Sequence, residues 1–193
     1  MTSPIAAALA RLSLAVLFAV IVMTFVLVST AGGAGRAASG YLAPAGACQG
    51  STDPAASLRI QQRAVRCLVN WARMRHRQPR LSQSRSLHRA AALKGRGVVA
   101  CRQISHTPCG SDASATVRSA GYEYASFAEN LYVGSLGAAS AREVVSAWLQ
   151  SPGHRENILR SGFRDVGAAL VRADGVFYEG AAVVWIVAFA APR

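Results

Sequence analysis

The hydrophobic positions of this chain predict three amphipathic helices. Apolar residues recur at helical spacing over residues 54–77, 84–94 and 138–150, with Pro79 ending the first stretch and Ser151-Pro152-Gly153 following the last. We expect the core-facing residues of these helices to be Leu58, Val65, Leu68, Val69, Ala72, Leu87, Ala91, Leu93, Val144, Val145 and Trp148.

Two later apolar stretches, residues 165–172 and 182–189, predict strands. Both are rich in valine, and the Asp174-Gly175 pair between them is typical of a tight turn. Helices therefore come first along the chain and strands last. This order favours an α+β domain in which helices flank a sheet, and it disfavours an alternating βαβ fold.

The first 35 residues differ in character from the rest. From Leu12 to Val28 nothing is more polar than Ser13 and Thr24, and small residues follow. An early cation, an apolar core and a tail of small residues are typical of an export signal. The core of about 17 residues is also just long enough to cross a membrane. We expect residues 1–35 to form an N-terminal hydrophobic helix, either a signal peptide or a transmembrane anchor. A buried core helix fits this position and composition poorly.

Composition also suggests the domain boundaries. Residues 36–53 are rich in Gly, Ala, Ser and Pro and are expected to form a flexible linker. Residues 54–193 have a normal length for one domain with one core.

Export changes the interpretation of the cysteines. There are four, Cys48, Cys67, Cys101 and Cys109, and an even count in an oxidising compartment suggests two disulfides. Three pairings are possible, of which Cys48–Cys67 with Cys101–Cys109 is the simplest. Zinc ligation is the competing interpretation, but no two cysteines have the short C-x-x-C spacing.

The formal charge of +12 is concentrated in one part of the chain. No acidic residue lies between Asp53 and Asp112, where eleven arginines and Lys94 occur. Such a field suits anionic lipid headgroups or wall polymers. An arginine-rich coding bias on a solvated face is the alternative, and outside the cell we expect no nucleic-acid partner. The arginines proposed for surface contact are Arg59, Arg63, Arg66 and Arg73.

Three side chains are candidates for chemistry. His106 lies between Cys101 and Cys109, and a disulfide there would hold it on a constrained loop. His154 follows the Ser-Pro-Gly break, and Glu129 precedes Asn130 between the two histidines. The remaining histidines, His76 and His88, lie in arginine-rich helical surroundings and are expected to face solvent.

Together these motifs resemble the CAP superfamily (cysteine-rich secretory proteins, antigen 5 and pathogenesis-related-1), in its bacterial SCP-like branch. The resemblance covers about residues 58–191. The segments that carry it are Leu68-Val69-Asn70-Trp71-Ala72-Arg73, Ser105-His106-Thr107, Ala128-Glu129-Asn130-Leu131, Trp148, Ser151-Pro152-Gly153-His154-Arg155-Glu156-Asn157-Ile158-Leu159, Phe163-Arg164-Asp165-Val166-Gly167 and Trp185 to Phe189.

The resemblance implies a three-layer α–β–α sandwich with a cleft where His106, Glu129 and His154 converge. In several members the two histidines hold a divalent metal, often zinc, and neutral imidazoles suit that ion. Glu129 would then orient an imidazole. Animal members place a second Glu three residues after the helix Trp, where this chain has Ser151.

Three functions remain open from the sequence. The first is a binding module for a lipid or other small ligand, which the resemblance favours. The second is a hydrolase, such as a metal-assisted or His/Glu-based peptidase using Glu129, His106 and His154. The third is a structural cell-surface domain. No nucleophile lies in a recognisable setting, and no helix carries two histidines four residues apart. We therefore expect a monomeric binding or surface protein rather than an enzyme, with no obligatory cofactor.

Overall fold

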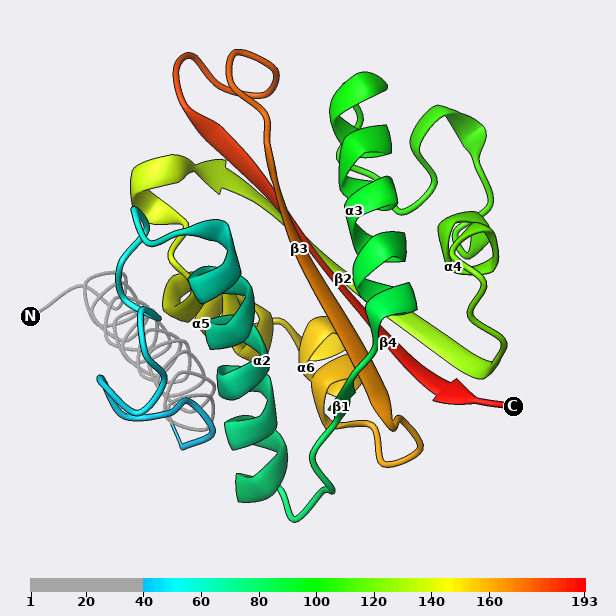
Figure 1. Cartoon of the computed structure of the whole chain (residues 1–193). Helices are drawn as coiled ribbons and strands as arrows, with labels where there is room; N and C mark the ends of the chain where they lie inside the picture. Colours follow the sequence, from blue (N-terminus) through cyan, green and yellow to red (C-terminus); the bar gives the residue numbers. More distant parts are fainter. Residues whose placement is uncertain (1–39) are drawn as a thin grey trace, which may run out of the picture. The chain divides into compact units, whose positions relative to one another are not determined.

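A four-stranded sheet in the order β1-β3-β4-β2 lies at the centre of the computed structural model, which describes residues 40–193 (Figure 1). β1 runs parallel to β3, whereas β4 is antiparallel to both β3 and β2. The strands are β1 (Ser82–Gln83), β2 (Tyr124–Ser135), β3 (Asp165–Arg172) and β4 (Ala182–Pro192). The hydrophobic helix expected at residues 1–35 lies outside the described residues.

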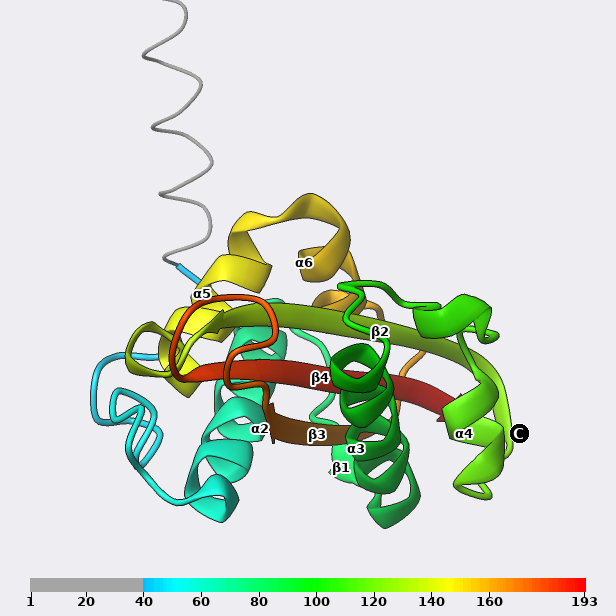
Figure 2. The same cartoon turned by 90° about the horizontal axis from the view of Figure 1, so that it is seen from above.

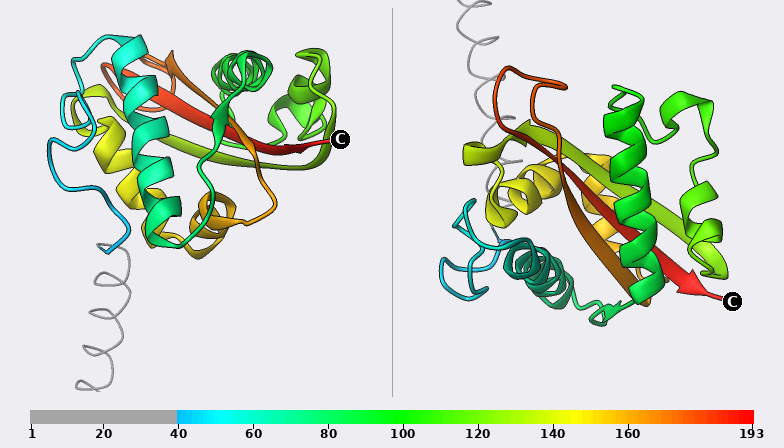
Figure 3. Two further views of the ribbon diagram at one scale, coloured as in Figure 1. Left: turned by 60° about the horizontal axis from the view of Figure 1, so that its bottom comes forward. Right: turned by 45° about the horizontal axis from the view of Figure 1, so that its top comes forward.

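Helices cover both faces of the sheet, and this confirms the expected α+β class. α2, α5 and α6 pack on one face, and α3 with α4 packs on the other (Figures 1 and 3). Figure 2 shows β2, β4 and β3 as successive strands seen from above. The helical segments are α2 (Leu58–Arg75), α3 (Arg85–Ala100), α4 (Ala115–Ser119), α5 (Ala141–Gln150) and α6 (Pro152–Leu159), with 3-10 turns η1 (Pro108–Gly110) and η2 (Leu136–Ala138).

The two central strands are apolar because both of their faces are covered. On β3, Val166, Ala168 and Leu170 face α2 and α5, while Ala169 faces α3. β4 is buried from Ala182 to Ala190. Successive side chains of each strand thus point alternately into the two hydrophobic cores. Both strands therefore contain a continuous apolar run, whereas polar and apolar residues alternate in a half-exposed strand.

Helix α2 corrects two expectations. Leu58, expected in the core, is 50% exposed because it is the first residue of the helix. Arg73, expected on the basic outer face, is completely buried. Its guanidinium donates hydrogen bonds to backbone carbonyls in the last turn of α6 and in the segments that follow α2 and α6. The predicted helical period was correct, but other segments of the chain cover only part of each face of α2 along its length.

Helix α3 is longer than expected and ends at Ala100, past Gly95 and Gly97. Ser84 caps its start by accepting a hydrogen bond from the Leu87 amide at 3.2 Å. A Cβ at position 95 would lie 2.7 Å from Val171 Cγ2, so glycine there allows α3 to approach β3 closely. Tertiary packing therefore outweighs the low helix propensity of glycine.

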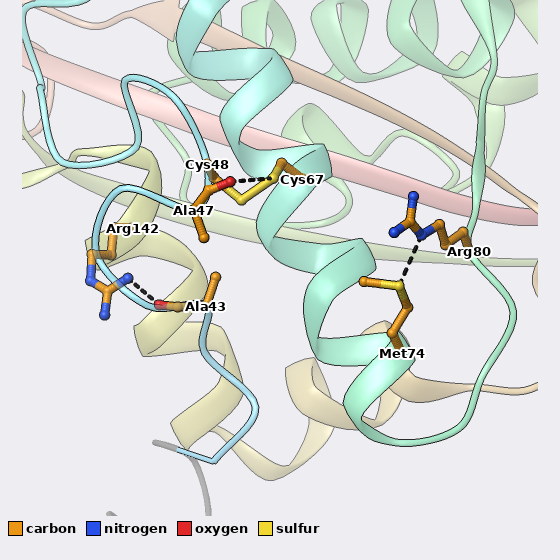
Figure 4. The surroundings of a disulfide bond; sticks show 7 residues. All are labelled: Ala43, Ala47, Cys48, Cys67, Met74, Arg80 and Arg142. Carbon is orange, nitrogen blue, oxygen red and sulfur yellow. Dashed lines mark hydrogen bonds between the residues drawn. A yellow bond between two sulfur atoms is a disulfide. The ribbon is translucent and has the colours of Figure 1, made fainter.

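Both disulfides follow the pairing that we considered simplest, Cys48–Cys67 and Cys101–Cys109. The first ties the segment before α2 to that helix (Figure 4). Ala43 in this segment is fully buried, and the Arg142 guanidinium donates to its carbonyl (Figure 4). These contacts hold the segment before α2 against the rest of the domain at Ala43 and Cys48.

Within residues 40–193, no helix combines the length and apolar character needed to cross a membrane. The apolar stretch 12–28 lies outside these residues, so the choice between a signal peptide and an anchor stays a prediction.

Candidate functional site

His106 lies on the loop between α3 and η1, and two contacts fix this loop. The Cys101–Cys109 disulfide closes it covalently. The Lys94 ammonium, only 1% exposed, donates to the backbone carbonyl of His106. Among the described residues no carboxylate pairs with Lys94, and a buried charge is costly unless it is hydrogen-bonded, so this bond matters for the local structure. The loop is thus anchored both at its ends and at the histidine itself.

Glu129 reaches the histidine from β2. His106 Nδ1 lies 2.7 Å from Glu129 Oε1. The Glu129 side chain is 5% exposed, whereas that of His106 is 51% exposed. Because an ionised carboxylate only accepts hydrogen bonds, Nδ1 is the donor, and Nε2 is left available as an acceptor or ligand. β2 places Glu129 opposite Ala188 of β4, which fixes the backbone below the carboxylate.

His154 lies in the first turn of α6, after the Pro152 that starts this helix. Its Nδ1 is 2.9 Å from Ser151 Oγ. Its backbone carbonyl accepts a hydrogen bond from Asn130 Nδ2 at 3.0 Å. Asn130 is fully buried on β2, next to Glu129, so β2 holds both the carboxylate and the helix that carries the second histidine.

Burial lowers the pKa of His154, and the charge of His106 lowers it further. Both effects favour the neutral imidazole. The structure therefore joins the His106 side chain to Glu129, and it fixes the backbone of His154 to Asn130, the residue that follows Glu129 on β2.

Sequence reasoning missed two residues that support this site. Lys94 gave no signal beyond its place in a basic segment. Ser151 was noted only because it stands where a glutamate was expected, yet its hydroxyl contacts His154. Of the two histidines expected to face solvent, His76 is exposed. His88 corrects the expectation, because it is half-buried and its Nδ1 lies 2.7 Å from the Ala168 carbonyl oxygen.

His106 and His154 are the candidate ligands for a metal ion at this site. Each histidine has its Nδ1 within hydrogen-bond distance of an oxygen, of Glu129 for one and of Ser151 for the other, and Nε2 can bind a cation where Nδ1 carries the proton. The described part of the chain holds no cluster of three or more His, Cys, Asp or Glu side chains arranged to bind a metal. An ion here would have two protein ligands, and its other positions would be taken by water or by a bound molecule.

Comparison with known proteins shows which family this sequence matches. The sequence profile of the cysteine-rich secretory protein family, CAP, matches residues 67–189. The uncharacterized protein YkwD of Bacillus subtilis (strain 168) is 28% identical over 130 residues, which are 67% of this chain and 49% of YkwD. This chain thus spans about half the length of the curated relative that it matches.

Solved bacterial structures share the fold. An outer surface protein from Borrelia burgdorferi superimposes with a TM-score of 0.62 at 17% identity, covering 72% of this chain and 97% of that one. An extracellular protein with an SCP domain from Bacillus anthracis gives a TM-score of 0.53 at 18% identity, covering 70% of this chain and 44% of that one. At these identities the likeness shows the fold alone.

Proposed function

This chain belongs to the cysteine-rich secretory protein family, and we propose that it is an exported binding module. Its cleft at His106, Glu129 and His154 would hold a divalent cation such as zinc and, through the open positions of that ion, a small ligand. A bound zinc would act as a Lewis acid for an oxygen atom of the ligand.

One observation carries this proposal: the hydrogen bond of 2.7 Å between His106 Nδ1 and the nearly buried Glu129 carboxylate. A carboxylate that accepts from Nδ1 fixes the tautomer and makes Nε2 a better metal ligand. The lowered pKa of His154 keeps the second imidazole deprotonated to lower pH than usual. Protons therefore compete less with a cation at this ring.

Export is supported by covalent structure and by likeness. The two disulfides are typical of oxidising compartments. The similar structures carry names that describe an outer surface protein and an extracellular protein. The apolar segment 12–28 supplies an export signal or an anchor.

The test is zinc uptake by the full-length chain after treatment with a chelator. Equilibrium dialysis or calorimetry should give about one zinc per chain, and His106→Ala with His154→Ala should abolish this uptake. Glu129→Gln should weaken binding by about 10–100-fold, because the neutral amide oxygen accepts from Nδ1 more weakly than the charged carboxylate does.

The matched control is His76→Ala, because this histidine is exposed and follows directly after the last residue of α2. Zinc uptake in this variant should equal that of the parent chain. Uptake that persists when both His106 and His154 are replaced would disprove the site as drawn.

One contact favours hydrolysis as a second candidate. Ser151 Oγ is 2.9 Å from His154 Nδ1, so a hydroxyl and an imidazole are within hydrogen-bond reach. Ser105, which is adjacent to His106 in sequence, contacts Thr107 instead, with 3.2 Å between the two hydroxyl oxygens. A panel of ester and peptide substrates tests this candidate: turnover that is lost in Ser151→Ala would support it, and no turnover would favour the binding module.

A further inference from the structure

A basic groove whose lining includes none of His106, Glu129 and His154 lies between α2 and α3. It has a volume of about 550 Å³, within the range of small-molecule sites. α2 contributes Arg59, Gln62, Arg63 and Arg66, α3 contributes Arg85 and His88, and the remaining lining residues are Gln83, Val166 and Ala168. We call this the α2–α3 groove.

An open sheet edge runs along the groove. β1 pairs only with Asp165 and Val166 of β3, so β3 continues beyond that point with no further strand beside it among the described residues. α2 and α3 lie on either side of this edge (Figure 1). The Ala168 carbonyl at the edge is already engaged by His88 Nδ1 at 2.7 Å. The arginines of α2 and α3 make the sides of the groove positive, and Val166 and Ala168 of β3 form its apolar floor.

Within residues 40–193, the guanidinium groups of this groove have no carboxylate partner. None of the salt bridges within residues 40–193 includes Arg59, Arg63, Arg66 or Arg85. The Arg66 guanidinium donates to the neutral Gln83 side-chain oxygen. Since the sequence has no acid between Asp53 and Asp112, neighbouring carboxylates within that segment cannot balance the charge. Four arginines converging on one groove thus favour an anionic occupant.

The spacing indicates the kind of anion. Arg59, Arg63 and Arg66 lie on successive turns of α2, and at 1.5 Å per residue the first and last are about 10 Å apart along the helix axis. Guanidinium groups bind phosphate oxygens in pairs. A row of arginines of this length is longer than a single phosphate or carboxylate group. It suits two linked phosphates, or a phosphodiester that carries a polar head group.

A second groove continues from the first and shares Arg63, Arg66 and Gln83 with it. Its volume is about 580 Å³, and its lining includes Trp71, Met74 and Leu81. Apolar surface next to a phosphate site suits a ligand that carries hydrocarbon beside its phosphate. A lipid headgroup and a soluble phosphate are therefore both sources of the same chemistry.

We propose that the α2–α3 groove is a binding site for phosphate-bearing molecules, with Arg59, Arg63 and Arg66 as the residues that contact phosphate. Arg73, which the sequence pattern grouped with them, has no part in it because it is buried. The site is independent of the metal cleft, so it stands whether or not that cleft binds zinc.

The experiment measures calorimetric binding of inorganic pyrophosphate to the full-length chain and to two charge-matched double variants. Arg59→Gln with Arg63→Gln removes two groove charges. Arg75→Gln with Arg96→Gln removes two charges from the same helices outside the groove. We expect the first pair to weaken binding roughly tenfold or more and the second to change it by less than about twofold.

A second arm identifies the source of the phosphate by flotation with phosphatidylcholine vesicles, with and without phosphatidylglycerol. Flotation that needs the anionic lipid, and that is lost in the groove variant but not in the control, supports the site with a lipid headgroup as its source. Pyrophosphate binding without such flotation supports the site with a soluble source. Equal losses in both double variants, or no binding of either probe, would overturn the proposal.

Discussion

Arg73 shows how a single buried cation can join distant segments. Its guanidinium is completely buried and has no carboxylate partner among its hydrogen bonds. Burial, together with the charge of Arg164, lowers its pKa to about 10. The carbonyl acceptors are those of Pro79, Ile158, Arg160 and Phe163, at 2.8, 2.8, 2.9 and 3.3 Å. The planar donor fork thus joins carbonyls of the last turn of α6 and of the segments that follow α2 and α6.

Replacing this residue should therefore destabilise the domain strongly. We expect Arg73→Met to lower the free energy of unfolding by about 3 kcal/mol or more, because it leaves several carbonyls without donors. Urea unfolding of the variant and of the parent chain measures the change. Arg75→Met on the same helix is exposed and should change stability by about 0.5 kcal/mol or less. Equal midpoints for the two variants would contradict this role.

At the scale of elements, the patterns with a clear period were predictable. α2, α5, β3 and β4 were predicted close to their observed bounds because their apolar residues repeat regularly. β2 was not predicted as a strand, although Glu129 and Asn130 were singled out. Its burial is irregular, with those two consecutive residues buried, because this edge strand carries polar site residues instead of a repeating apolar face. The sequence motifs identified the site residues, but they did not predict the strand that carries Glu129 and Asn130.

The contacts that complete the site were less predictable. Lys94 meets the His106 carbonyl, and Ser151 meets His154, only after the chain folds. The same limitation applies to Arg73. Its sequence position places it on the basic face of α2, but the loops that cover it come from elsewhere in the chain. Periodicity defines the faces of a helix, whereas tertiary packing decides which part of each face is covered.

The contact between α3 and β3 gives a prediction at this scale. A Cβ at Gly167 would lie 2.1 Å from both the Leu87 carbonyl carbon and the His88 amide nitrogen. These are backbone atoms of α3, so the helix itself would have to move. We expect Gly167→Ala to lower the free energy of unfolding by about 2–3 kcal/mol.

Thermal unfolding and urea titration measure this effect. Gly162→Ala is the matched control, because a Cβ there meets nothing within 4 Å. Its stability should stay close to that of the parent chain. If Gly167→Ala were as stable as Gly162→Ala, the close packing of α3 on β3 would be refuted.

The whole domain has a covalent link on either side of the sheet. Cys48–Cys67 ties the segment before α2 to that helix, and Cys101–Cys109 closes the His106 loop after α3. The first segment is also held without the disulfide, because the Arg142 amide donates to the Ser51 carbonyl at 2.8 Å. The first disulfide therefore affects how the segment before α2 is attached, and the second affects the shape of the loop that carries His106.

Removing each disulfide should separate stability from binding. The cysteine pairs are 19 and 8 residues apart, which on the chain-entropy model corresponds to about 3 and about 2.5 kcal/mol. Both double Cys→Ser variants should lose stability of that order in urea unfolding. Only Cys101→Ser with Cys109→Ser should also weaken zinc uptake, because it frees the loop that positions His106. If Cys48→Ser with Cys67→Ser weakened zinc uptake equally in chains still folded, the disulfide around His106 would have no specific part in shaping the cleft.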